Sequence, residues 1–334
     1  MKILKGYGLA MLLMCILVIT GSWGFLVHRT VHQLAVYELP SEIMPFFYSH
    51  MDYLVREATR PDKRRNQDST EATKHFIDLE AYGTDAAKKM PMDWQKAIQM
   101  YSKDSLLKYG YVPYHVIYIK GKLTEAFKQM NKDSILFYAA DLGHYISDAN
   151  VPLHTTINYD GQLTNQKGLH SLWESMIPEL EIEKYKLYTS HKATYVKKPA
   201  NAIWRAVRQA AKLVPELLAV EKEISKGFTE EQKYRTQIRR GHESKSYTSG
   251  FAKSYAAALQ NTINDQLINS ANLIADFWFT CWIDAGKPDL LDLAKGWSEE
   301  KNAKLSLEIK AFKENNLLTN KLLLSKKAES KEGE

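Results

Sequence analysis

The chain has 334 residues, of which 45% are hydrophobic, and this is enough to build a large core. Its formal net charge of +6 is too small for a dedicated nucleic-acid binder but is compatible with a substrate that carries phosphate. No domain-sized stretch has low complexity, so we expect one domain with short additions at its ends.

The N-terminus has the pattern of a secretory signal peptide. Two lysines precede the apolar run LAMLLMCILVIT (9–20), and the small residues Gly21 and Ser22 follow it. We therefore predict that residues 1–22 are a signal peptide, that cleavage leaves Trp23 at the mature N-terminus, and that the protein is periplasmic or secreted. The apolar run is short for a bilayer span, so an uncleaved membrane anchor is the less favoured alternative.

From Trp23 onward the apolar residues recur at helical spacing, with few alternating runs and no Asn-Gly hairpin signals. The predicted fold class is all-α, with a single multi-helix domain over residues 23–290. We expect the charged segment 225–246 to be an exposed connection. We expect residues 291–334 to be a charged helical tail that docks on the domain or is partly disordered, with a membrane surface as its alternative partner. The predicted helices cover residues 27–37, 41–58, 94–109, 116–130, 133–149, 169–180, 200–226 and 249–283.

The segment HYISDANVPLH (144–154) carries a pattern of metal ligands. His144 and Asp148 are four residues apart in a helical segment, so both side chains leave the same face and one metal can take both. Pro152 disfavours helical backbone in the residue before it. The helix should therefore end there and direct His154 toward a different metal.

A second pair follows in the segment HSLWE, where His170 and Glu174 are again four residues apart. A lone histidine on a helix is usually structural, but two such pairs with His154 between them indicate metal binding. Histidine and carboxylate without thiolate suit zinc, and an open coordination position would make the site catalytic. Only Cys281 would remain in the mature chain, so metals or core packing must provide the stability that a disulfide would give.

Together these motifs resemble the zinc-dependent phospholipase C and S1/P1 nuclease superfamily. The resemblance covers residues 23–290, and WGFLVH (23–28), RPDKRR (60–65) and HFIDLE (75–80) match further parts of the pattern in order. It implies an all-α fold that holds three zinc ions in a cleft. The implied ligands are Asp62, His75, His144 and Asp148 for one zinc; Trp23, through its α-amino group and carbonyl oxygen, His28 and a bridging oxygen of Asp148 for its neighbour; and His154, His170 and Glu174 for the third.

The resemblance also implies hydrolysis of a phosphodiester by a zinc-activated water, without a protein nucleophile. Asp62 would orient or deprotonate this water, and Arg65 would contact the phosphate, although a solvated basic turn is the alternative for Arg65. Asn158, in the turn-forming segment between the two histidine motifs, is a further candidate for substrate contact. From spacing alone, Asp78 is expected to accept the second imidazole N–H of His75.

The sequence features that bear on the substrate are divided between two branches of this superfamily. Glu174 as the last ligand resembles phospholipase C, which we favour. The spacing from Trp23 to His28 and from Asp62 to Arg65 resembles the single-strand nuclease and 3′-nucleotidase branch, which is the alternative. The expected partner is therefore a phospholipid headgroup or a single-stranded nucleic acid, and no protein partner is predicted.

Two further alternatives remain at this point. His32 lies four residues after His28 and could replace it as a ligand. A non-catalytic helical module with structural metal sites is the alternative from another class of protein.

Overall fold

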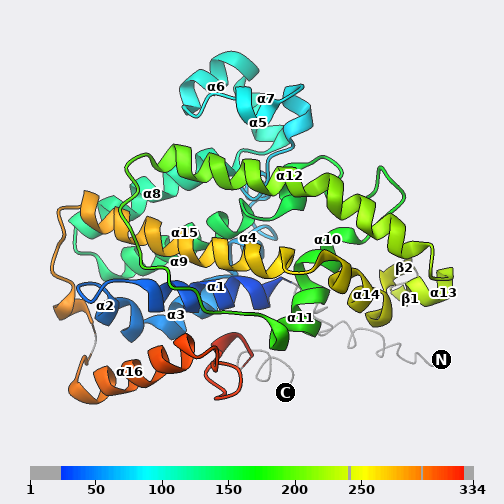
Figure 1. The fold of residues 1–334 in the computed structure, drawn as a ribbon. Helices are drawn as coiled ribbons and strands as arrows, with labels where there is room; N and C mark the ends of the chain where they lie inside the picture. Colours follow the sequence, from blue (N-terminus) through cyan, green and yellow to red (C-terminus); the bar gives the residue numbers. More distant parts are fainter. Residues whose placement is uncertain (1–23, 240–241, 295, 327–334) are drawn as a thin grey trace, which may run out of the picture.

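The computed structural model describes residues 24–239, 242–294 and 296–326, and most of them are helical (Figure 1), which confirms the all-α class. The predicted signal peptide and Trp23 lie outside the described residues. The α-helices are α1 (Phe25–Glu38), α2 (Met44–Ser49), α3 (Met51–Glu57), α4 (Arg60–Arg64), α5 (Ala86–Lys89), α6 (Trp94–Tyr101), α7 (Lys103–Tyr109), α8 (Val112–Lys128), α9 (Lys132–Asp148), α10 (Leu169–Ser171), α11 (Ile177–Glu181), α12 (Pro199–Ser225), α13 (Glu230–Lys233), α14 (Ser249–Leu259), α15 (Thr262–Asp284) and α16 (Glu299–Lys313).

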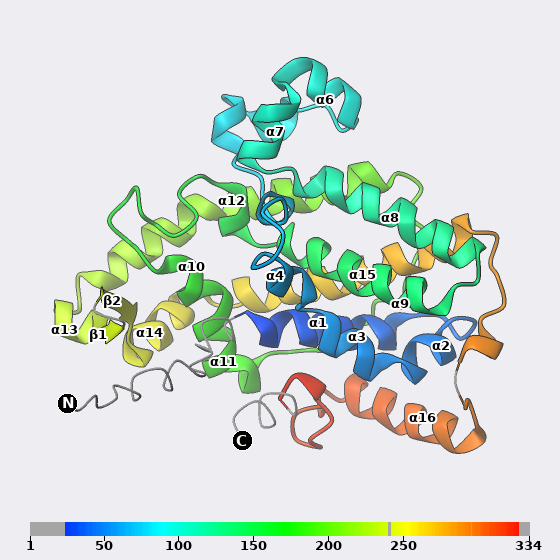
Figure 2. The same cartoon turned by 180° about the vertical axis from the view of Figure 1, so that it is seen from behind.

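Shorter elements connect these helices. The 3-10 turns are η1 (Ala72–Lys74), η2 (Leu79–Tyr82), η3 (Pro152–Thr155), η5 (Ile182–Lys184) and η6 (Leu291–Leu293). A π-helical turn, η4 (Leu172–Met176), continues α10 into α11. Two antiparallel strands, β1 (Tyr234–Arg239) and β2 (His242–Tyr247), form a hairpin at one side of the molecule (Figure 2).

Helices α1, α9 and α15 pack against one another at the centre of the fold. Helix α3 covers α1 and α9, while α8 packs on α9 and α15 and is covered in turn by α12 (Figures 1 and 2). The buried indole of Trp278 on α15 donates to the carbonyl oxygen of Ala139 on α9 at 3.0 Å. These contacts build a large apolar cluster around α1, α9 and α15. A second, smaller apolar cluster includes Leu153, Trp173 and Tyr255.

His32 belongs to this packing and not to a metal cluster. Its Nδ1 lies 2.7 Å from the carbonyl oxygen of His28, and its Nε2 lies 3.0 Å from the carbonyl oxygen of Ala140 on α9. Helices α1 and α9 approach closely here because residue 143 is glycine: a Cβ on Gly143 would lie only 2.4 Å from His32 Nε2. His32 is therefore engaged by backbone carbonyls, which favours His28 as the ligand on α1.

Three of the predicted helices are broken in the structure. The segment 41–58 divides into α2 and α3 at His50, 94–109 divides into α6 and α7 at Ser102, and 249–283 divides into α14 and α15 after Leu259. Ser102 has φ of 65° and its hydroxyl accepts from the backbone N–H of Ser105 at 3.2 Å, so it caps the start of α7. Apolar periodicity continues through each break, which is why it predicted single helices.

The predicted exposed connection at 225–246 is also wrong in part, because it contains α13 and most of the hairpin. Tyr234 pairs with Tyr247 at the base of the hairpin, and their ring centroids lie 4.8 Å apart. Lys233, at the end of α13, pairs with the buried Glu221 of α12 at 2.7 Å. The aromatic contact and the ion pair thus stabilise the hairpin. The sequence did not predict its strands, because no turn motif lies between them.

The C-terminal tail docks on α1. The hydroxyl of Tyr37 donates to Glu308 of α16 at 2.9 Å, and the hydroxyl oxygens of Thr30 and Ser325 lie 2.9 Å apart. The apolar side chain of Phe312 is buried in the same interface. The side chain of Phe312 therefore packs against the domain. Within the described ranges, none of the helices combines the length and apolar character that crossing a bilayer requires.

Glu38, at the end of α1, provides a test of this packing. Its carboxyl is buried, and burial, followed by the negative charge of Asp276, raises its pKa from 4.5 to about 9. The folded state therefore keeps a proton that the unfolded chain releases, so this contribution to stability is complete at low pH and is lost as the pH rises to about 9.

We expect the free energy of unfolding of Glu38→Gln protein to fall less steeply between about pH 5 and pH 9 than that of the wild type, by up to about 1.4 kcal/mol per pH unit. Urea denaturation at a series of pH values measures this difference. Identical pH slopes for the two proteins would contradict the buried, protonated state of Glu38.

Candidate metal centre

Eight of the nine residues predicted as metal ligands lie together in the structure. In each of three clusters, one ligand atom from every member lies within 4.8 Å of the others. The ninth, Trp23, lies outside the described residues. The first cluster consists of Asp62, His75 and His144; the second of His28, His144 and Asp148; and the third of His154, His170 and Glu174.

Separate elements deliver these side chains. Helix α1 carries His28, α4 carries Asp62, and α9 carries His144 and Asp148, while His75 follows η1. Helix α9 ends at Asp148 and the chain turns into η3, which begins with Pro152, so His154 leaves in a new direction, as the position of Pro152 predicted. The backbone N–H of Ile77 donates to the carbonyl oxygen of His154 at 2.9 Å and joins the two segments.

The third cluster is built on an irregular turn. His170 lies in the short α10, and Glu174 lies in the π-helical turn η4. Their side chains meet at 2.6 Å between Nε2 and Oε2. π-Helical turns are rare in proteins, and those that occur are frequently found at functional sites. The sequence predicted an α-helical face here, and the π-helical turn is a difference that i,i+4 spacing alone does not reveal.

Asp148 connects all three clusters. Its Oδ2 lies 2.9 Å from His75 Nδ1 and 3.2 Å from His144 Nε2. Its Oδ1 lies 3.6 Å from His28 Nε2 and 3.5 Å from His154 Nδ1. The side chain is 1% exposed. The two oxygens of one buried carboxylate therefore face different pairs of imidazoles, which is the arrangement that a bridging ligand needs.

The hydrogen-bonding distances of the ring nitrogens indicate that cations fit these clusters. His144 Nδ1 lies 2.8 Å from the carbonyl oxygen of Ala58, which can only accept, so Nδ1 carries a proton and Nε2 faces the cluster. His144 Nε2 lies 3.1 Å from His75 Nδ1, and the Nε2 atoms of His154 and His170 lie 3.0 Å apart. Each facing pair can share one proton in a hydrogen bond, whereas a cation between them would engage both lone pairs.

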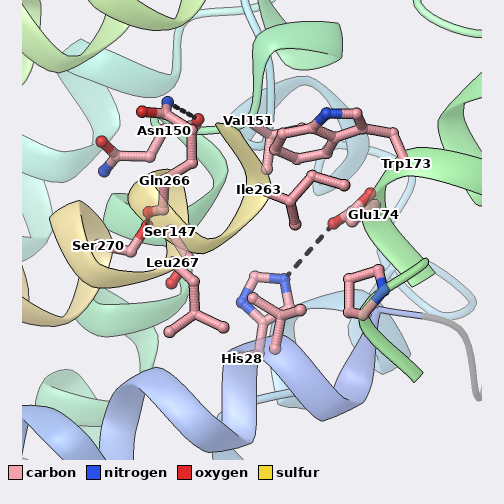
Figure 3. Close-up of a pocket in the computed structure, with 12 residues that line it drawn as sticks. His28, Ser147, Asn150, Val151, Trp173, Glu174, Ile263, Gln266, Leu267 and Ser270 are labelled. Carbon is pink, nitrogen blue, oxygen red and sulfur yellow. Dashed lines mark hydrogen bonds and ion pairs between the residues drawn. The ribbon is translucent and has the colours of Figure 1, made fainter. Parts of the chain in front are cut away.

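His28 lies at an apolar pocket on the inner side of the centre. Figure 3 shows His28 and Glu174 directed toward one another beside Trp173, Ile263 and Leu267. Burial, followed by the positive charge of His144, lowers the pKa of His28 to about 4. The imidazole is therefore neutral near pH 7, which is the form that ligates metals.

The chemical types of the donor atoms give a second indication. The donor set of imidazoles and carboxylates suits zinc, and the thiol of Cys281 lies elsewhere, against the carbonyl oxygen of Lys120. The residues present therefore fit the predicted zinc ions.

Opposite charges balance within the centre. Burial lowers the pKa of His144, but Asp148 and Asp62 outweigh it and raise this pKa to about 9. Burial alone would raise the pKa of Asp148, yet His144 and His75 hold it well below its usual range. The carboxylate is thus ionised and ready to bind a cation, which would displace a proton from the imidazoles.

The two predicted substrate contacts have different surroundings. The side chain of Arg65 is 49% exposed, and its Nη1 lies 3.9 Å from Asp62 Oδ1. Asn158 is buried, and its amide donates to Thr164 at 3.0 Å and accepts from the backbone N–H of Leu163 at 2.7 Å. Arg65 is therefore available to a substrate, whereas a contact by Asn158 would compete with bonds that organise its own loop.

The predicted partner of His75 is wrong. Glu71 Oε1 lies 3.5 Å from His75 Nε2, and Asp78 makes no such contact. The chain leaves helical geometry after His75, so a residue three positions later does not return to the imidazole, whereas Glu71 lies on the preceding turn. Glu71 and His75 are four residues apart, and this is the same spacing that identified the other two pairs.

Comparisons with known proteins do not identify a family. No family model matches the chain, and none of the curated proteins matches it either. The resemblance to the zinc-dependent phospholipase C and S1/P1 nuclease superfamily therefore rests on the residue pattern in the sequence.

Replacing Asp148 should affect more than one zinc ion. We expect zinc-loaded Asp148→Asn protein to lose about two zinc ions per chain, because the amide removes a charge that faces both the first and the second cluster. Glu174→Gln should lose about one, from the third cluster. Mass spectrometry of zinc content after gel filtration measures both losses. Equal losses from the two variants would contradict the shared position of Asp148.

Proposed function

We propose that the protein is an exported zinc-dependent phosphodiester hydrolase of the phospholipase C type. The observation that carries this proposal is the position of Asp148, whose two oxygens face separate pairs of imidazoles. Paired cations held by a shared carboxylate suit the cleavage of phosphate esters. The fold has a large apolar core of its own, which argues against metals that serve only a structural role.

The three clusters would hold the zinc ions. When bound there, zinc supplies positive charge for a phosphate and lowers the pKa of water from 15.7 toward about 7. Asp62 is the ligand best placed to orient that water or accept its proton, because its side chain is 28% exposed while that of Asp148 is 1% exposed. Arg65, on the turn that follows α4, would contact a phosphate oxygen. No protein side chain is needed as a nucleophile.

Exposed apolar side chains beside the third cluster support a lipid substrate. Ile157, Tyr159 and Leu163 are 40%, 50% and 66% exposed, and all three lie on the loop between His154 and His170. Glu80 holds the start of this loop by accepting from the hydroxyl of Thr156 at 2.6 Å and from the backbone N–H of Ile157 at 3.1 Å. A fixed loop with exposed apolar side chains suits a lipid–water interface.

A single-strand nuclease is the second candidate. The ring centroid of Tyr159 lies 6.1 Å from that of His170, so an exposed aromatic face stands beside the third cluster. Such a face can stack on a nucleobase while Arg65 contacts the phosphate. This arrangement, together with the spacing of Asp62 and Arg65, favours the nuclease branch.

Export would create a further ligand, because cleavage after residue 22 frees the α-amino group of Trp23. The backbone of Gly24 lies beside the centre, since a Cβ on Gly24 would be 3.5 Å from Glu174 Oε1. A terminus immediately before Gly24 would therefore begin close to the clusters. This proximity supports the proposed role of the Trp23 α-amino group as a ligand.

Hydrolysis assays with zinc-loaded protein that begins at Trp23 test the proposed function. We expect release of phosphorylated headgroups from phosphatidylethanolamine and phosphatidylcholine vesicles, and little nucleotide release from single-stranded DNA or RNA. Nucleotide release with untouched lipid would establish the nuclease instead. Absence of turnover on every phosphodiester would leave a non-catalytic metal-binding module.

Two arginine variants serve as a matched pair in the same assays. Arg65→Ala should lower kcat/KM by about tenfold to a hundredfold on the preferred substrate, because it removes a charged contact to the phosphate. Arg56→Ala also removes one positive charge, but from α3, where the exposed Arg56 pairs with Glu57. It should leave kcat/KM unchanged.

A further inference from the structure

We propose that Glu71 is a positioning residue that keeps the ring proton of His75 on Nε2 and so directs the Nδ1 lone pair toward the first cluster. This inference deepens the proposed function and rests on His75 being a ligand there. It assigns a role to a buried carboxylate that the metal-ligand pattern does not include.

The imidazole of His75 lies between two carboxylates. Its Nδ1 lies 2.9 Å from Asp148 Oδ2 on the side of the cluster, and its Nε2 lies 3.5 Å from Glu71 Oε1 on the opposite side. Nε2 is buried and has no other partner among the described residues. Glu71 is thus the acceptor that lies nearest to a proton on Nε2.

Glu71 is held as an anion by its surroundings. The side chain is fully buried, yet its Oε2 lies 2.6 Å from Lys74 Nζ and 3.1 Å from Arg64 Nε. Tyr145 of α9 donates its hydroxyl to Oε1. A buried carboxylate with two cationic partners stays ionised and keeps a fixed orientation. It therefore acts only as an acceptor toward His75.

His144 shows the same principle with a different acceptor. Its Nδ1 donates to the carbonyl oxygen of Ala58 at 2.8 Å, so the backbone fixes the proton on the side away from the cluster. Near His75 the described structure places no backbone carbonyl in hydrogen-bonding distance of Nε2, and Glu71 takes this place. Partners of this kind orient metal-ligating histidines, and their loss typically costs tenfold to a hundredfold in metal affinity.

The test uses Glu71→Gln, which keeps the size of the side chain but removes its negative charge and can donate a hydrogen bond toward Nε2 through its amide. Two readouts are taken: the hydrogen bond made by the Nε2–H of His75, from ¹H and ¹⁵N chemical shifts of the zinc-loaded protein, and the zinc affinity of the first cluster, from competition with a chelator. We expect the wild type to show an Nε2–H that donates to a carboxylate, and the variant to lose this hydrogen bond and bind zinc about tenfold to a hundredfold more weakly.

Asp141→Asn is the matched control, because Asp141 is a buried carboxylate that pairs with the same Arg64 at 2.9 Å but contacts no imidazole. It should destabilise the metal-free protein without changing the His75 proton or the zinc affinity. Equal affinity in Glu71→Gln and wild type would overturn the proposal, and so would an equal loss in Asp141→Asn.

Glu71→Asp keeps the experiment decisive if Glu71→Gln does not fold. It retains the anion but shortens it by one methylene, so its zinc affinity should lie between those of the wild type and Glu71→Gln. Affinity equal to that of the wild type would count against the proposal. Neither readout requires turnover, so an inactive protein would overturn the proposed function while the role of Glu71 stands or falls on its own.

Discussion

Placing the carboxylate of Asp148 out of water among four imidazoles constrains the whole centre. An ionised carboxylate in this position is costly unless cations or hydrogen bonds compensate it. Asp148 is 1% exposed, and imidazole nitrogens lie within 3.6 Å of both of its oxygens. Helix α9 fixes Asp148 relative to His144, and the surrounding elements converge on it. The requirement to compensate one buried charge thus explains why distant segments must meet here.

The support around the ligands is as specific as the ligands themselves. Arg64 joins two buried carboxylates, Glu71 and Asp141, so the segment that carries His75 is tied to α9 through an ion network. Close packing at Gly143 and the docked C-terminal tail hold α1, which carries His28. The buried candidate ligands therefore lie on elements that are packed against one another. The residues expected to meet a substrate, such as Arg65 and Leu163, are exposed and lie at turns.

Spacing in the sequence predicted that the candidate ligands lie together, because local geometry decides where their side chains point. The helical pair of His144 and Asp148 and the break at Pro152 depend only on backbone preferences. The π-helical turn at Glu174 and the break at Ser102 depend on packing and on capping, which apolar periodicity does not report. The choice of Glu71 over Asp78 depended on how the chain turns after His75. The residues that support the site were harder to predict than the ligands, because their contacts are mostly made between distant segments.

The observations favour a proposed metal centre more strongly than they favour one substrate. The buried imidazoles and carboxylates suit a cation site, whereas exposed side chains such as Tyr159 suit both a lipid interface and a nucleobase. Anomalous diffraction at the zinc absorption edge, from crystals of the zinc-loaded protein beginning at Trp23, would locate the ions themselves. We expect three peaks. One should lie on each side of Asp148, and the third should lie among His154, His170 and Glu174. A single peak, or peaks that Asp148 does not contact, would contradict the shared carboxylate on which the proposed reaction depends.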